Sequence, residues 1–217
     1  MPTRGRLRFL VLALMPLLVA GGSLAAPRTG KKASAYLKYF DALELMASGR
    51  GSEARRQLEE ILQIDPAAAE VHATLARLCL RDGDLLCAES HGERAVELAP
   101  MLSEGHRVLA DIDLQQFQRT REPDALDRGL AHLTAAAKAE PQDAATWTQW
   151  IRALAGNGRG DEAKDVASRA AAVPGADPSI PWMALARVFL GRGETDRAIA
   201  VLESIEIPGR GAVPILE

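Results

Sequence analysis

The stretch HATLARLCLRDGDLLCAESH, residues 72–91, brings two histidines and two cysteines into one short segment. In chain order they are His72, Cys79, Cys87 and His91. Imidazole nitrogens and thiolate sulfurs are the ligands that Zn²⁺ prefers, so four of them converging on one point would form a metal site. The two cysteines alone would instead support a disulfide or a redox centre. Which of these applies depends on the elements that position the four side chains.

An internal repeat defines those elements. Pro66 and Pro100 are 34 residues apart. The same spacing separates Gly49 from Gly83, Ala54 from Ala88, His72 from His106, Leu75 from Leu109 and Ala76 from Ala110. A later pair of segments repeats at a spacing of 35, which relates Trp147 to Trp182, Gly158 to Gly193 and Ala163 to Ala198. Pro100 and Pro141 are 41 apart, which predicts a seven-residue insertion within FQRTREPDALD, residues 117–127.

This pattern resembles the tetratricopeptide repeat family, whose unit is an antiparallel helix pair of about 34 residues. The family keeps small residues at three positions of the unit and favours Pro near its end. In the segment 69–100 these places hold Ala76, Ala88, Ala95 and Pro100. Small side chains let two helices pack closer than Leu would allow. The resemblance implies an all-α protein, a right-handed superhelical solenoid of about five antiparallel helix pairs.

The repeat also predicts the domain organisation. The helical repeat domain is expected over residues 35–208, after a linker at 26–34 and before a C-terminal tail at 209–217. Its units are expected at about 35–66, 69–100, 103–141, 144–175 and 179–208.

The N-terminus MPTRGRLRFLVLALMPLLVAGGSLAAP has the layout of a secretory signal peptide. Three arginines precede the apolar run Phe9 to Ala20, small residues follow it, and cleavage fits best between Ala25 and Ala26. The alternative is an uncleaved membrane anchor, but a run of 12 residues is shorter than the ~20 needed to span a bilayer. The sequence therefore predicts a periplasmic or secreted protein without a stable membrane span after cleavage of residues 1–25.

Composition and charge restrict the class of partner. With 47% apolar and 25% charged residues, the chain has enough apolar material for a packed core. Removal of the leader leaves 23 basic and 29 acidic residues, a net charge of −6. An acidic balance of this kind argues against nucleic acid as the partner.

The repeat predicts where the histidines and cysteines lie within each helix pair. His72 recurs as His106, and His91 and His132 fall at equivalent places on second helices, so packing explains them and no metal is predicted. Cys79 and Cys87 flank the turn RDGD, which leaves open either a disulfide between them or two unpaired cysteines. A small periplasmic redox or metal-binding protein that uses these cysteines is the alternative function.

Enzyme signatures are absent from the sequence, which has no Gly-rich phosphate loop, nucleophile elbow or His-Glu-x-x-His motif. The glycines in GNGRGDEA and GRGETDRA fall in expected turns between paired helices. We therefore predict a non-catalytic protein without a cofactor.

The resemblance implies that a partner protein or peptide binds in a concave groove lined by the first helix of each unit. The family's groove positions correspond to Arg107 at one level and to Arg77, Arg152 and Arg187 one helical turn deeper. A row of guanidinium groups would suit acidic side chains or a peptide's terminal carboxylate. The alternative is a solvated face in which Arg107 pairs with Asp111 across one helical turn.

The two ends of the array have features of their own. Tyr36, Tyr39 and Phe40 in AYLKYF either cap the exposed end of the first helix pair or anchor a partner peptide. At the other end Ile199 and Leu202 are expected to face solvent. Such an apolar edge would be covered by the chain's own tail or would mediate self-association.

Overall fold

The computed structural model describes residues 28–203 and 205, with side chains from residue 34 onward. The predicted signal peptide and the tail at 209–217 lie outside this range. Every regular element within it is an α-helix. The ten helices are α1 (Arg28–Ala47), α2 (Gly51–Ile64), α3 (Ala69–Arg81), α4 (Leu85–Leu98), α5 (Ser103–Thr120), α6 (Pro123–Ala139), α7 (Ala144–Gly156), α8 (Gly160–Ala171), α9 (Ser179–Gly191) and α10 (Thr195–Glu203).

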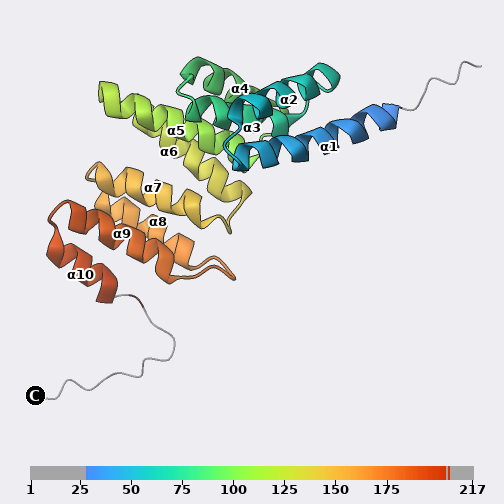
Figure 1. Cartoon of the computed structure of the whole chain (residues 1–217). Helices are drawn as coiled ribbons and strands as arrows, with labels where there is room; N and C mark the ends of the chain where they lie inside the picture. Colours follow the sequence, from blue (N-terminus) through green and yellow to red (C-terminus); the bar gives the residue numbers. More distant parts are fainter. Residues whose placement is uncertain (1–27, 204, 206–217) are drawn as a thin grey trace, which may run out of the picture.

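The helices form five antiparallel pairs that stack along one axis in a right-handed solenoid (Figure 1). Each odd-numbered helix packs against the even-numbered helix that follows it, and α4, α6 and α8 pack against the first helix of the next pair. Ala76, Ala88 and Ala95 are all fully buried where helices cross. Their methyl groups permit a close approach, which explains the small residues at these repeat positions.

Glycines shape the turns within four of the pairs. Gly49, Gly83, Gly158 and Gly193 have φ angles of 79°, 81°, 84° and 76°. This left-handed conformation is strained for residues with a Cβ atom, so Gly is favoured directly after a helix end. The glycines that mark the sequence repeat therefore reverse the chain between paired helices.

The seven-residue insertion of the third pair does not form an extra loop but extends the two helices of that pair. The helices α5 and α6 are 18 and 17 residues long, whereas α3 and α4 have 13 and 14. Arg121, with φ of 61°, takes the left-handed place that Gly holds in the other turns, and Pro123 begins α6. Gly129 allows α6 to lie close to α5, since a Cβ atom there would be 3.1 Å from Leu114 Cγ. The insertion therefore lengthens both helices.

The first helix also differs from the prediction. It begins at Arg28, inside the range 26–34 that we predicted as a linker. Lys31, Lys32 and Ala33 all have high helix propensity, so extending an existing helix through them costs little free energy. Among the described helices, none is both long and apolar enough to cross a membrane.

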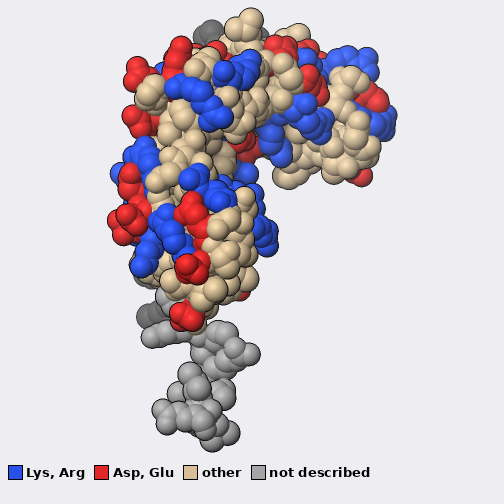
Figure 2. Space-filling view, turned by 90° about the vertical axis from the view of Figure 1, so that its left-hand side faces the viewer, with Lys and Arg blue, Asp and Glu red and all other residues tan. Residues whose placement is uncertain are grey.

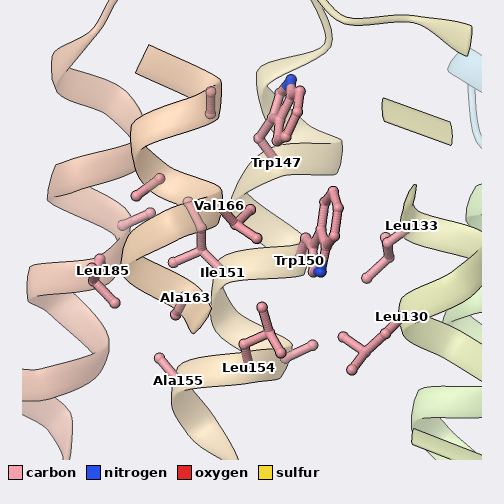
Figure 3. Packing of buried hydrophobic residues seen from close by; sticks show 14 of the residues in the cluster. Leu130, Leu133, Trp147, Trp150, Ile151, Leu154, Ala155, Ala163, Val166 and Leu185 are labelled. Carbon is pink, nitrogen blue, oxygen red and sulfur yellow. The ribbon is translucent and has the colours of Figure 1, made fainter. Parts of the chain in front are cut away.

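The largest core cluster joins α6 to the last two pairs (Figure 3). Trp147 and Trp150 of α7 stack with ring centroids 5.7 Å apart, and the guanidinium of Arg169 lies over both rings. Leu130 and Leu133 of α6 belong to the same cluster. The packing of α6 on α7 thus continues the core beyond the lengthened third pair.

The C-terminal edge exposes apolar side chains, as expected. Ile199 is 48% exposed and Leu202 is 43% exposed on α10. That the C-terminal tail or a second copy of the chain covers these side chains stays a prediction.

Replacing Leu133 with Ala should lower the free energy of unfolding by about 2–5 kcal/mol, because this fully buried side chain would leave a cavity beside α7. Urea denaturation followed by circular dichroism measures the change. The control is Leu86→Ala, at a side chain that is 81% exposed, where we expect a change within about 0.5 kcal/mol. Equal losses in the two variants would contradict the described packing.

Candidate functional site

The four residues of the opening segment form two separate contacts. Cys79 near the end of α3 and Cys87 near the start of α4 are joined by a disulfide, with sulfur atoms 2.03 Å and Cα atoms 5.8 Å apart. Within the described residues, the only cluster of three or more His, Cys, Asp or Glu donors is Cys79, Asp84 and Cys87. Because the sulfurs are bonded to each other, they are not thiolates that could hold a metal ion.

A guanidinium group covers the disulfide from α2. Arg55 Nη2 lies 2.9 Å from Cys79 Sγ and 2.9 Å from Cys87 Sγ. The same guanidinium group forms ion pairs with Asp84 at 3.4 Å and with Glu59 at 3.6 Å. Asp84 also accepts a hydrogen bond from the Cys87 backbone N–H and so caps α4.

The histidines pair within their repeats. Nδ1 of His72 on α3 lies 2.9 Å from Nδ1 of His91 on α4, and the same atoms of His106 and His132 are 3.0 Å apart. His72 Nε2 lies 3.1 Å from the Pro66 carbonyl oxygen, which can only accept a hydrogen bond. In the neutral pair His72 therefore carries its proton on Nε2, and Nδ1 of His91 donates to Nδ1 of His72.

The bond to the proline carbonyl recurs with a different side chain. His106 Nε2 lies 3.0 Å from the Pro100 carbonyl oxygen, and Trp147 Nε1 donates to the Pro141 carbonyl at 2.8 Å. All three rings occupy the same position in their units. They tie the first helix of a unit to the turn that precedes it, which is a structural role.

The histidine pairs should make stability depend on pH. Burial lowers the pKa of His91, and His72 and Arg55 lower it further, while burial and then His106 lower that of His132. An unfolded histidine takes up a proton near pH 6.5, whereas His91 and His132 in the folded chain resist protonation at that pH because their pKa values are lowered. The free energy of unfolding therefore has its full value above about pH 6.5, where these histidines are neutral in both states, and it decreases as the pH falls below about 6.5.

Urea titrations between pH 7.5 and 5.5 test this expectation. The double variant His91→Gln and His132→Gln should lose less stability than the native chain over this range, because Gln does not titrate. Parallel loss in the two proteins would show that other groups govern the pH dependence.

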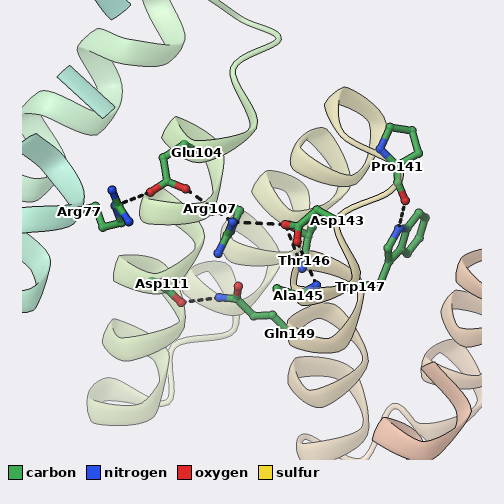
Figure 4. A network of polar contacts seen from close by, with 10 residues as sticks. All are labelled: Arg77, Glu104, Arg107, Asp111, Pro141, Asp143, Ala145, Thr146, Trp147 and Gln149. Carbon is green, nitrogen blue, oxygen red and sulfur yellow. Dashed lines mark hydrogen bonds and ion pairs between the residues drawn. The ribbon is translucent and has the colours of Figure 1, made fainter. Parts of the chain in front are cut away.

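Two of the four predicted groove arginines, Arg77 and Arg107, form ion pairs with acidic residues of neighbouring elements (Figure 4). Arg77 on α3 contacts Glu104 at 2.8 Å. Arg107 on α5 contacts Glu104 at 3.6 Å and Asp143, which caps α7, at 3.3 Å. Burial raises the pKa of Asp143, but the Thr146 hydroxyl and Arg107 outweigh it, so that pKa is lowered overall. These two arginines link neighbouring pairs.

Asp111 does not pair with Arg107, in contrast to the alternative drawn from sequence. Its carboxylate accepts a hydrogen bond from the side-chain amide of Gln149 on α7 (Figure 4). Burial raises the pKa of Asp111, although the bond from Gln149 and the charge of Arg107 oppose the shift. Arg107 instead forms its ion pairs with Glu104 and with Asp143 at the start of α7.

A cleft of about 750 Å³ opens between α5 and α7. The two helices make few direct contacts, and within the third pair it is α6 that packs against α7. The cleft combines apolar surface, four side-chain amides, one guanidinium group and the carboxylate of Asp111, which is hydrogen-bonded to Gln149. Its lining includes Leu114, Phe117, Gln115, Gln118, Gln149, Asn157 and Arg152.

The remaining two arginines of the row have no charged partner. Arg152 on α7 and Arg187 on α9 are exposed and form no hydrogen bond or ion pair within the described part of the chain. Both occupy the same position in their units. Of the predicted row, these two guanidinium groups are available to a partner.

The predicted aromatic residues separate into two environments. Tyr39 is half-buried and its hydroxyl lies 2.9 Å from the Thr74 hydroxyl on α3. Tyr36 and Phe40 are 68% and 65% exposed and line an apolar cavity of about 340 Å³ between α1 and α3. Tyr39 thus fixes α1 to the array, whereas Tyr36 and Phe40 present open apolar surface.

Several residues of these sites could not be found from the sequence. Arg55 is one of two adjacent arginines on α2, and nothing in its spacing pointed to the cysteines. The equivalent places of His91 and His132 were visible, but their pairing required the distance between two helices. Gln149 and Asp143 carried no signal at all.

Comparisons with known proteins bear on the fold. Models of the tetratricopeptide repeat match residues 45–115 and 148–212. This chain belongs to the tetratricopeptide repeat (TPR) family. No curated protein matches its sequence.

Solved structures of TPR proteins resemble the whole array. A thermophilic TPR protein of Thermus thermophilus has 25% identity and a TM-score of 0.61, over 78% of this chain and 88% of that one. The pilF protein of Pseudomonas aeruginosa has 15% identity and a TM-score of 0.64, over 80% and 76%. The MamA protein has 15% identity and a TM-score of 0.58, over 78% and 88%. The latter two show the fold alone.

Proposed function

We propose that this TPR protein is an exported, non-catalytic scaffold that binds an extended acidic segment of a partner protein in its groove, at α7 and α9. The observation that carries the proposal is the availability of Arg152 and Arg187, while Arg77 and Arg107 are held in ion pairs. Protein binding itself is what TPR arrays support. That the bound segment is acidic and that it lies at α7 and α9 are the specific parts of this proposal.

The chemistry of the cleft supports an extended peptide as the occupant. Side-chain amides both donate and accept hydrogen bonds, as a peptide backbone does, and Arg152 adds a forked cation suited to a carboxylate. Acidic and basic side chains are interspersed over the surface shown in Figure 2. A preformed helical array also loses little conformational entropy when it binds.

Binding of short fluorescein-labelled peptides rich in Asp and Glu tests the proposal through fluorescence anisotropy. The double variant Arg152→Glu and Arg187→Glu should weaken binding at least about tenfold, since hydrogen bonds between charged groups contribute roughly 1.5–3 kcal/mol. Peptides with Asn and Gln in place of the acids should bind weakly to both proteins. Added salt should also weaken binding of the acidic peptides.

The matched control is the double variant Arg56→Glu and Lys164→Glu. It makes the same change in net charge at exposed positions on α2 and α8, outside the cleft. If the control lost as much affinity as the variant with Arg152→Glu and Arg187→Glu, net charge rather than the groove would explain binding.

The export part of the proposal is supported by the arrangement of residues 1–25 and by a disulfide, which persists in oxidising compartments. Expression in a bacterial host with periplasmic fractionation tests it. We expect the protein in the periplasmic fraction with a mass that corresponds to a start at Ala26. A full-length chain retained in the cytosol or the membrane would refute export with cleavage.

A redox role for Cys79 and Cys87 is the second candidate, because Arg55 contacts both sulfurs. The metal-binding version has no comparable support, since the disulfide uses both thiolates.

A further inference from the structure

The disulfide between α3 and α4 is exposed on one side only. Cys79 is fully buried, whereas Cys87 is partly exposed. Thiol–disulfide exchange begins with attack of an external thiolate on one sulfur, so access decides which sulfur reacts. A reagent in solution therefore reaches Cys87 Sγ first.

Arg55 places a positive charge where negative charge would develop. Its Nη2 atom lies 2.9 Å from each sulfur, close enough to donate a hydrogen bond to either one as a thiolate. An adjacent cation lowers the pKa of a thiol and makes it a better leaving group. Asp84 and Glu59 hold this guanidinium group in place and offset part of its charge.

We propose that Cys79–Cys87 is a thiol-exchange site for a low-molecular-mass thiol, with Arg55 stabilising the leaving thiolate. A thiolate attacks Cys87 Sγ, a new bond forms between the two sulfurs, and the Cys79–Cys87 bond breaks. Its electron pair passes to Cys79 Sγ, which becomes a thiolate beside Arg55. A second thiolate then attacks the external sulfur, which releases the Cys87 thiolate and a low-mass disulfide. The protein is reduced by two electrons and two thiols are oxidised.

The choice of a small thiol follows from the setting of Cys87. Cys87 is only partly exposed, and the Arg55 guanidinium group lies 2.9 Å from its sulfur. This geometry admits a small molecule more readily than the surface of a folded protein. The site involves α2, α3 and α4, whereas the proposed peptide cleft lies between α5 and α7, so the two can fail independently.

Reaction of the oxidised mature protein with reduced glutathione tests the proposal. Samples quenched with acid and analysed by mass spectrometry give the rate and the modified residue. We expect glutathione on Cys87, and we expect Arg55→Gln to slow the reaction roughly three- to tenfold, as the leaving thiol loses its cation. The control Arg56→Gln, next along α2, should react at the native rate.

A second variant should act in the opposite direction. Asp84→Asn keeps a good helix cap but removes a carboxylate from Arg55, so the reaction should become faster. Arg55→Gln also separates charge stabilisation from a structural role, because loosening the fold would expose the disulfide and speed its reduction.

The thiol left by Cys87→Ala offers an independent readout. Its titration, followed by thiolate absorbance, should give a higher pKa for Cys79 when Arg55→Gln is added. Glutathione attached to Cys79, equal rates for the Arg55 and Arg56 variants, or no change in this pKa would overturn the proposal.

Discussion

Close approach between helices is the constraint on which the rest of this structure depends. Ala76 and Ala88 are fully buried where paired helices cross, and Gly92 lies so near Leu109 that a Cβ atom would be 2.9 Å from its Cδ2. At this separation side chains on facing helices meet directly. The disulfide, the two histidine pairs and the bond between Tyr39 and Thr74 all require it.

The lengthened third pair interrupts this regularity. Since α5 and α7 make few direct contacts, polar groups on their facing surfaces are not covered by apolar packing. Arg107 reaches Asp143 and Gln149 reaches Asp111 across this space, while the rest of it stays open as the cleft. The cleft where we propose that a peptide binds therefore lies beside the lengthened third pair, and Phe117 and Gln118 from the range of the insertion line it.

Charge is distributed unequally along the groove for a related reason. Arg77 and Arg107 lie where Glu104 and Asp143, near the starts of α5 and α7, come within reach. Arg152 and Arg187 form no ion pair with a carboxylate among the described residues, and both are exposed. Arg77, Arg152 and Arg187 share one repeat position, yet Arg77 links two units whereas Arg152 and Arg187 form no ion pair in the described part of the chain.

The sequence by itself determined the class of fold, because the spacing of small residues, Gly and Pro records how each helix pair packs on itself. It also located the turns, the insertion and the candidate groove arginines. It did not determine which arginines are free, since that depends on acids one unit away in sequence but adjacent in space. The partners of His72 and of Cys79, and the position of Arg55 over the disulfide, were likewise decided only by tertiary structure. Helical periodicity fixes the face on which a side chain lies, whereas the distance between helices fixes what it touches.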